Sequence, residues 1–226
     1  MSETDHWTSG PTDPHGAPPA PDGYADPYSF VYPTVVVLVG SSLLGVLSLA
    51  GVVGLLWELQ GPALFAAFTD VTVDGETTAY SVDLIAIGVP VLVALVLTAV
   101  VHELVHGAVF AHYGHEVSYG VAPAMGAFYA GAFGQFQERE ALLRVGLAPL
   151  VLVTAVCVPL LIVPIPFVAI TAAFVLVLNG SGAIVDLYLA WRLRRMPPGT
   201  LLYDVDIDRS YVYEPLAGDD RSSPVE

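Results

Sequence analysis

The sequence has no lysine and only one cysteine, and each shortage excludes a class of protein. Its seven basic residues are all arginine, and they stand against 22 acidic residues, for a formal net charge of −15. Such an acidic chain should not bind nucleic acid, because its surface repels phosphates. The single Cys157 excludes an internal disulfide and any zinc site built from cysteines, and its place in an apolar run predicts a packed thiol.

Charged residues are also scarce along most of the chain, because they are concentrated in a few places. Residues 1–30, 58–83 and 204–226 hold five, five and seven of the acidic residues, although the whole sequence is 55% hydrophobic. Acidic, lysine-free exposed segments resemble those of halophilic archaea, where carboxylates keep protein surfaces hydrated at high salt. Acidic disordered tails explain the two terminal zones equally well.

Long apolar runs between these zones predict an all-α integral membrane protein with about four transmembrane helices. The residues before the first run and after the last are rich in acidic and turn-forming types, so we expect a disordered acidic tail at 1–33 and a cytoplasmic acidic tail at 192–226. The spans themselves are expected at about residues 34–57, 84–110, 142–163 and 167–191, with kinks at internal prolines.

Two connections between the expected spans have unusual compositions. Residues 58–83 are polar but contain a short apolar patch, Pro62 to Phe68, which we expect to lie on the membrane surface. Residues 111–141 are rich in glycine, alanine and aromatic residues, too interrupted for a plain span and too apolar for an ordinary loop. A hairpin or a re-entrant segment buried against protein fits this composition.

The arginines predict the orientation of the spans. Arg139 and Arg144 flank the start of the third span, and Arg192, Arg194 and Arg195 follow the fourth, whereas residues 58–83 contain no arginine. Positively charged residues are enriched on the cytoplasmic side of membrane proteins. We therefore expect a multi-pass protein of the cell membrane with both termini in the cytoplasm.

The second expected span contains the pentad His102-Glu103-Leu104-Val105-His106. On a helix, two histidines four residues apart differ by about 40° around the axis, so both imidazoles can occupy adjacent corners of a zinc tetrahedron. Glu103 lies about 100° round from His102, where a carboxylate can reach a water without binding the ion itself. The pattern predicts a Zn²⁺ site with Glu103 as the general base.

Asp186 is the candidate for the third ligand. Glu103 and Asp186 are the two acidic residues inside the expected spans, and an unpaired charge near the centre of a span costs about 2.5–3.5 kcal/mol. His102 and Asp186 lie 18 and 19 residues along parallel spans, which is about 27 and 28 Å from the outer side. A shared metal site at matching depth would remove both costs. The alternative is that Asp186 reaches water or pairs with Arg192 or a neighbouring arginine.

Other polar residues near the expected site have more than one candidate role. Asn179 lies seven residues before Asp186 on the same helical face, where it supports the site, orients substrate or only bridges two helices. His112 stands ten residues after His102, as in longer zinc motifs, but Val109 replaces the glycine that lets the chain turn there. His115 and Glu116, at the exit of the span, are further candidates.

These residues resemble a known group of membrane proteins. The run from His102 to Gly107, followed by Asn179 to Gly182 and by Asp186, is similar to the family named "putative zincin peptidase", which is related to site-2 proteases. The resemblance covers about residues 84–191 and implies that His102, His106 and Asp186 bind Zn²⁺ while Glu103 acts as general base. The chain departs from the site-2 protease pattern because Leu187 follows Asp186 where that group has glycine, and because the Asn-Pro motif ahead of the aspartate is missing.

The residues and the resemblance predict the same function, a membrane-embedded zinc metalloprotease domain over residues 34–191. Two imidazoles and one carboxylate leave a fourth position on zinc for water, whose proton Glu103 would take. The expected partners are the lipid bilayer and a membrane-protein or peptide substrate, which must unwind locally or arrive extended, and residues 111–141 could offer it an edge. The alternatives are a catalytically silent metal-binding or scaffold protein and a purely structural helical protein. Fe²⁺, Co²⁺ and Mn²⁺ remain alternatives to zinc.

Overall fold

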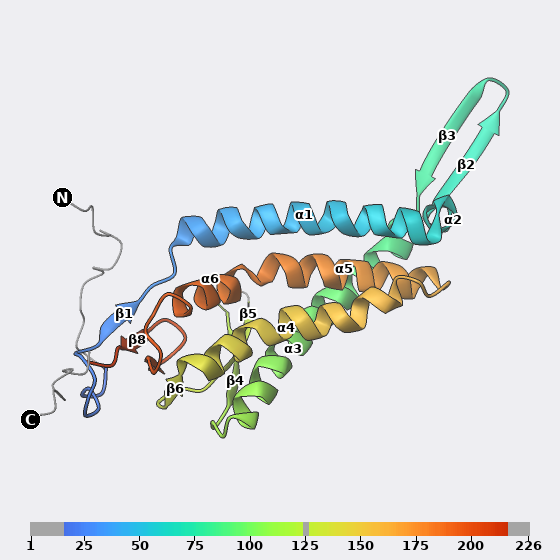
Figure 1. Ribbon diagram of the computed structural model, residues 1–226. Helices are drawn as coiled ribbons and strands as arrows, with labels where there is room; N and C mark the ends of the chain where they lie inside the picture. The colour runs from blue at the N-terminus through green and yellow to red at the C-terminus, as the bar shows by residue number, and fades with distance from the viewer. Residues whose placement is uncertain (1–15, 124–126, 217–226) are drawn as a thin grey trace, which may run out of the picture.

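The computed structural model describes residues 16–123 and 127–216, and it consists of a helical bundle with β-structure at both ends (Figure 1). The helices are α1 (Thr34–Gln60), α2 (Pro62–Ala66), α3 (Leu84–His112), α4 (Arg139–Leu160), α5 (Pro166–Gly182) and α6 (Ile184–Leu193). The strands are β1 (Tyr28–Phe30), β2 (Thr69–Asp74), β3 (Thr77–Val82), β4 (Ser118–Ala122), β5 (Ala127–Gly131), β6 (Phe136–Glu138), β7 (Leu201–Asp204) and β8 (Ser210–Tyr213).

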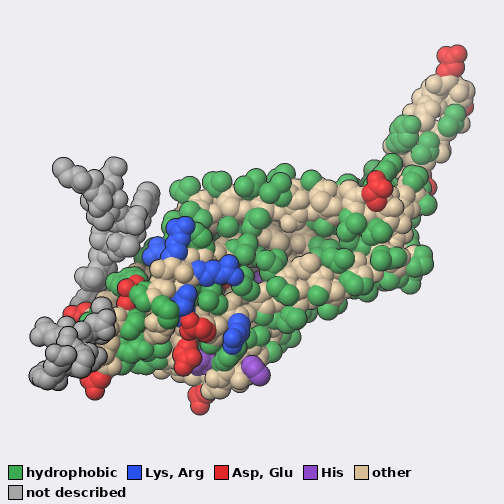
Figure 2. All heavy atoms as spheres, viewed as in Figure 1, with side chains coloured by type: hydrophobic (Ala, Val, Ile, Leu, Met, Phe, Trp, Pro, Cys, Tyr) green, Lys and Arg blue, Asp and Glu red, His purple; other side chains and the backbone are tan. Residues whose placement is uncertain are grey.

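Three helices, α1, α3 and α4, are long and apolar enough to cross a membrane. The pair α5 and α6 makes a fourth such segment if the two are counted as one span, but it is bent by 42° at Ala183. The expected spans are thus present as three to four apolar helices. Apolar side chains cover the visible face of the bundle (Figure 2), as a lipid-facing surface requires.

Helix α5 lies at the centre of the bundle and packs against α1, α3 and α4. Its contact with α1 depends on small residues, because a Cβ on Gly180 would stand 2.5 Å from Ser48 Oγ. One residue further along α5, the Ser181 hydroxyl donates a hydrogen bond to the Ser41 carbonyl oxygen at 3.0 Å. The small residues Gly180 and Ser181 therefore let α1 approach α5 closely, as in other membrane helix pairs.

A four-stranded antiparallel sheet in the order β1-β8-β7-β6 adjoins the end of the bundle where α4 begins and α6 ends. Its strands pack into a second core, which contains Phe30, Phe110, Leu193, Leu202 and Val212. The prediction of an all-α protein is therefore wrong. The segment expected as a disordered tail at 1–33 contains β1, and the segment expected as a cytoplasmic acidic tail at 192–226 contains β7 and β8. Strand β1 pairs with β8. Residues 1–15 and 217–226 of those tails lie outside the described residues.

Two further hairpins replace the expected connections. Strands β2 and β3 form an exposed hairpin that projects from the far end of the bundle (Figure 1), where a polar loop was expected. Strands β4 and β5 form a second hairpin within residues 111–141, which contacts α3. Of the two expectations for that segment, the structure has the hairpin packed against protein. The arginines gather at the end of the bundle opposite the β2–β3 hairpin (Figure 2).

Candidate metal centre

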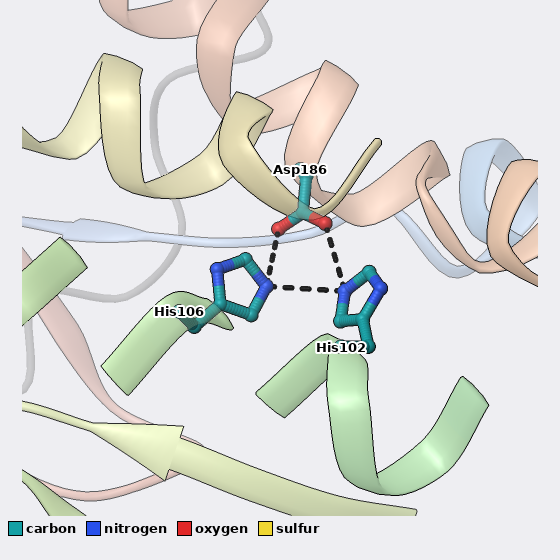
Figure 3. A group of neighbouring side chains, drawn as sticks. All are labelled: His102, His106 and Asp186. Carbon is teal, nitrogen blue, oxygen red and sulfur yellow. Dashed lines mark hydrogen bonds and ion pairs between the residues drawn. The ribbon is translucent and has the colours of Figure 1, made fainter. Parts of the chain in front are cut away.

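His102, His106 and Asp186 converge on one point between α3 and α6 (Figure 3). His102 Nε2 lies 3.3 Å from Asp186 Oδ2, and His106 Nε2 lies 3.5 Å from Asp186 Oδ1. The two Nε2 atoms are 3.1 Å apart. All three side chains are largely buried, with 11–14% of each exposed. The structure thus brings together the three residues that the sequence singled out as metal ligands.

The outer nitrogen of each imidazole contacts an oxygen that fixes its tautomer. His102 Nδ1 lies 3.0 Å from Asn179 Oδ1, and His106 Nδ1 lies 3.0 Å from the carbonyl oxygen of Val145. A carbonyl oxygen can only accept, so Nδ1 must carry the proton in both rings. In the neutral rings, both Nε2 atoms therefore carry a lone pair, and both lone pairs face the carboxylate of Asp186.

This arrangement fits a tetrahedral metal ion. Donor atoms that lie 2.0–2.2 Å from Zn²⁺ at tetrahedral corners are about 3.3–3.6 Å from one another. The two Nε2 atoms are 3.1 Å apart, and one donor atom from each of the three residues lies within 4.8 Å of the others, so small shifts suffice to bind an ion. Two facing lone pairs and a carboxylate repel one another unless a metal ion or a proton lies between them. Two imidazoles and one carboxylate also form a common ligand set of catalytic zinc, which leaves one position open.

Helix α4 supplies the carbonyl group that orients His106, and a proline makes it available. In a regular helix the Val145 carbonyl oxygen would accept a hydrogen bond from the N–H of residue 149. Residue 149 is Pro149, inside α4, and proline has no N–H. The Val145 carbonyl is therefore free to accept from His106 Nδ1. Asn179 is held by the same segment, since its Nδ2 donates to the Pro149 carbonyl oxygen at 3.4 Å.

The bend between α5 and α6 places Asp186 opposite the histidines. Asp186 lies in the first turn of α6, just after the bend at Ala183. The positive end of a helix dipole stabilises a carboxylate in this position. Gly146 of α4 faces the backbone of Asp186. A Cβ added to Gly146 would lie 3.7 Å from the Asp186 carbonyl oxygen, which is an ordinary van der Waals distance. The alternative pairing is not seen, because among the described residues no ion pair joins Arg192 to Asp186.

Glu103 lies beside the three residues without joining them. Its Oε2 accepts a hydrogen bond from the backbone N–H of Ala130 in β5, at 2.7 Å. The hairpin is held against α3 at Gly107, where any Cβ would overlap the ring of Tyr119. Gly107 thus lets the β4–β5 hairpin approach closely enough to hold the carboxylate of Glu103.

The other candidate ligands lie apart from this centre. His112 is exposed at the end of α3, and its ring contacts Tyr113. Helix α3 continues without interruption from the pentad to His112, so it does not turn that side chain back. His115 lies against Phe110, and Glu116 is exposed. Among the described residues, His102, His106 and Asp186 form the one group of three potential metal ligands.

Sequence reasoning missed two groups of the centre, the carbonyl of Val145 and the N–H of Ala130. Both are backbone groups, which nearly every residue carries, so their side chains give no signal. Pro149 was a usable signal for the first, because a proline inside a helix leaves a carbonyl unpaired four residues earlier. No comparable signal marks Ala130.

Residues 95–201 match the model of the family described as "Putative zincin peptidase". The matched segment contains the pentad, Asn179 and Asp186, as well as the β4–β5 hairpin and helices α4, α5 and α6. The family expected from the sequence is therefore confirmed over this segment. No curated protein and no solved structure matches the chain significantly.

Proposed function

We propose that this chain is a membrane-embedded zinc metalloprotease that hydrolyses peptide bonds in or near the bilayer. The observation that carries the proposal is the convergence of two imidazole lone pairs with the carboxylate of Asp186. Both rings are fixed in the tautomer that a metal requires, by Asn179 and by the carbonyl of Val145.

In this proposal His102, His106 and Asp186 hold the ion, and zinc suits their N₂O donor set best. A bound Zn²⁺ would lower the pKa of a water and polarise the carbonyl oxygen of the scissile bond. Glu103 takes a proton from the attacking water as its oxygen bonds to the carbonyl carbon. Glu103 then gives that proton to the amine nitrogen as the C–N bond breaks. The products are a carboxylic acid and an amine, and Glu103 returns to its starting state.

The β4–β5 hairpin is the proposed place for an extended substrate segment. Because the Ala130 N–H donates to Glu103, this edge of β5 is directed at the centre rather than at β4. A substrate strand added along this edge would bring its carbonyl groups close to Glu103. Crosslinking a bound peptide to a different element would overturn this part of the proposal. We further propose that the centre lies toward the cytoplasmic side, with both termini in the cytoplasm.

The proposal is tested by measuring bound zinc and peptide cleavage together. We expect about one zinc per detergent-purified wild-type chain, a large loss in Asp186→Ala, and full retention in Glu103→Gln. Cleavage of a quenched fluorescent peptide should fall at least about 100-fold in Glu103→Gln, because a general base contributes on that order. Glu116→Gln, an exposed acidic residue near the same helix end, is the matched control and should change neither value.

Two results would contradict the proposal in different ways. Zinc retained in Asp186→Ala would remove Asp186 from the ligand set. Zinc retained in Glu103→Gln with unchanged cleavage would remove the base, and it would favour a catalytically silent metal-binding or scaffold protein.

A further inference from the structure

A cavity of about 260 Å³ lies beside the candidate metal centre. It is bounded by the β4–β5 hairpin, by α6 and by the sheet that contains β7 and β8. Ala130, which donates to Glu103, and Val185, which precedes Asp186, both line it. A cavity of this size suits one amino-acid side chain rather than a large ligand. Because Ala130 and Val185 line it, the cavity adjoins the point at which the proposed function places the scissile bond.

Aromatic rings form much of the cavity wall. They come from four parts of the chain and comprise Phe30, Tyr32, Phe110, Phe128, Tyr129 and Phe133. Burial, and then the charges of Asp204 and Asp186, raise the pKa of the Tyr32 phenol. Aromatic faces attract cations as well as apolar groups. The wall alone therefore does not decide between a basic and an apolar occupant.

The decisive group is Asp204, at the end of β7, which also lines the cavity. Its carboxylate accepts hydrogen bonds from Gln137 Nε2, at 3.0 Å, and from Ser210. Within residues 16–123 and 127–216, no ion pair joins Asp204 to a basic side chain. Burial raises the pKa of this carboxyl group. Asp206 differs, because it is more exposed and pairs with Arg209 at 2.6 Å.

Asp204 is half-buried. Removing more water from a carboxylate without a cation beside it is costly, and a cationic ligand offsets that cost. An apolar occupant would cover Asp204 further and leave its charge uncompensated. The sequence contains no lysine, and no arginine lines the cavity in the described part of the chain. Among the described residues, no basic side chain of the cavity supplies a counter-charge to Asp204.

We propose that this cavity binds the side chain of a substrate lysine or arginine next to the scissile bond, with its cationic group at Asp204. The inference rests on the proposed function, since it takes the substrate to be a peptide held at the metal centre. The aliphatic stem of the basic residue lies along the aromatic wall, and its head reaches the carboxylate. The protein thereby selects peptides by a basic side chain.

The test uses peptides of the form Ala-Leu-Ala-X-Ala-Leu-Ala with a fluorescent label. Position X is lysine in one peptide and norleucine in the other, so that the two side chains have the same stem and differ in charge. Binding is measured by fluorescence anisotropy with zinc-loaded Glu103→Gln, which should bind without cleaving. We expect the lysine peptide to bind at least about tenfold more tightly than the norleucine peptide.

Two further substitutions, each made in Glu103→Gln, test whether the preference for lysine depends on Asp204. Asp204→Asn keeps an oxygen acceptor for Gln137 but removes the charge, and it should abolish the preference for lysine. Asp208→Asn makes the same change at an exposed residue of the neighbouring turn and should retain the preference. A melting curve and the zinc content establish that each variant is folded.

The outcomes separate the pocket from the catalytic proposal. Equal binding of the two peptides, or tighter binding of norleucine, overturns the basic pocket without any further variant. A lysine preference that persists in Asp204→Asn also overturns it. If lysine is preferred through Asp204 but zinc-loaded wild type cleaves neither peptide, the pocket stands and the protease function fails. If both peptides are cleaved without a lysine preference, the protease function stands and the pocket fails.

Discussion

At the scale of single residues, the centre depends on groups that accept hydrogen bonds from the outer nitrogens, Nδ1, of the two histidines. An imidazole can bind a metal through either nitrogen, and a partner on Nδ1 decides that Nε2 faces inward. Asn179 performs this task for His102, and it is almost fully buried, at 1% exposure. Its amide is itself held by the Pro149 carbonyl. Such outer contacts commonly change metal affinity by about 10–100-fold.

We therefore expect Asn179→Leu to lower zinc affinity by at least about tenfold, because His102 loses the acceptor that fixes its tautomer. Competition with a fluorescent zinc chelator measures the affinity. Thr171→Val is the matched control, since Thr171 is also buried on α5 but its hydroxyl bonds only to Phe167 of the same helix. Unchanged affinity in Asn179→Leu would show that the amide serves only to join two helices.

At the scale of elements, helix α4 contributes to the centre through its internal proline. Restoring an N–H at position 149 gives the Val145 carbonyl its regular helical partner, which competes with His106. We expect Pro149→Ala to weaken zinc binding by about tenfold, even though alanine favours the helix. Pro159→Ala, in the last turns of the same helix, should leave zinc binding unchanged. Competition with the same zinc chelator measures the zinc affinities. Equal affinities in Pro149→Ala and wild type would contradict the role of the freed Val145 carbonyl.

The hairpin β4–β5 contributes through its position on α3. A valine at Gly107 would push Tyr119 away, and the Ala130 N–H would move with the hairpin from Glu103. We expect Gly107→Val to lower peptide cleavage at least about tenfold while bound zinc stays near one per chain, because misplacing a catalytic group by about 1 Å costs on the order of 100-fold. Gly88→Val, on the same helix with nothing within 4 Å of the added Cβ, is the control. Loss of zinc in Gly107→Val would contradict the inference that Gly107 positions the hairpin at Glu103 without affecting zinc binding.

The elements differ in how far the sequence could predict them. The apolar helices follow from long uninterrupted runs, which need no knowledge of their neighbours. The meeting of Asp186 with the histidines followed from the cost of charge inside such runs and from equal depth. The bend at Ala183 had no such local signal, because small residues permit a bend without requiring one. Nothing in the composition of residues 111–141 distinguished a β-hairpin from a re-entrant helix.

At the scale of the whole molecule, the sheet shows the limit of sequence reasoning. Tyr28 pairs with Val212 across most of the chain, and their strands are only three and four residues long. Short strands in segments rich in acidic and turn-forming residues look like tails until the partner strand is known. The sheet has a functional consequence, since it brings Asp204 to the cavity beside the centre. Acidic residues that the composition assigned to a solvated tail thus lie next to the proposed site.

The arrangement of charges also predicts how the molecule sits in a membrane. The hairpin β2–β3 projects from one end of the bundle and carries Asp70, Asp74 and Glu76 without any basic residue. The turn between β7 and β8 belongs to the other end, where the arginines gather. With four membrane crossings, the positive-inside rule places the hairpin outside and the sheet in the cytoplasm.

This orientation is tested with single cysteines and a membrane-impermeant maleimide. In a Cys157→Ala background, which removes the one native thiol, Glu76→Cys reports on the hairpin and Asp208→Cys on the turn between β7 and β8. Both positions are exposed, so accessibility within the protein does not limit labelling. We expect Glu76→Cys to be labelled on intact cells and Asp208→Cys only after permeabilisation. The reverse pattern would invert the protein, and it would place the metal centre and its basic pocket toward the outer side, where the substrate would have to be an extracytoplasmic segment.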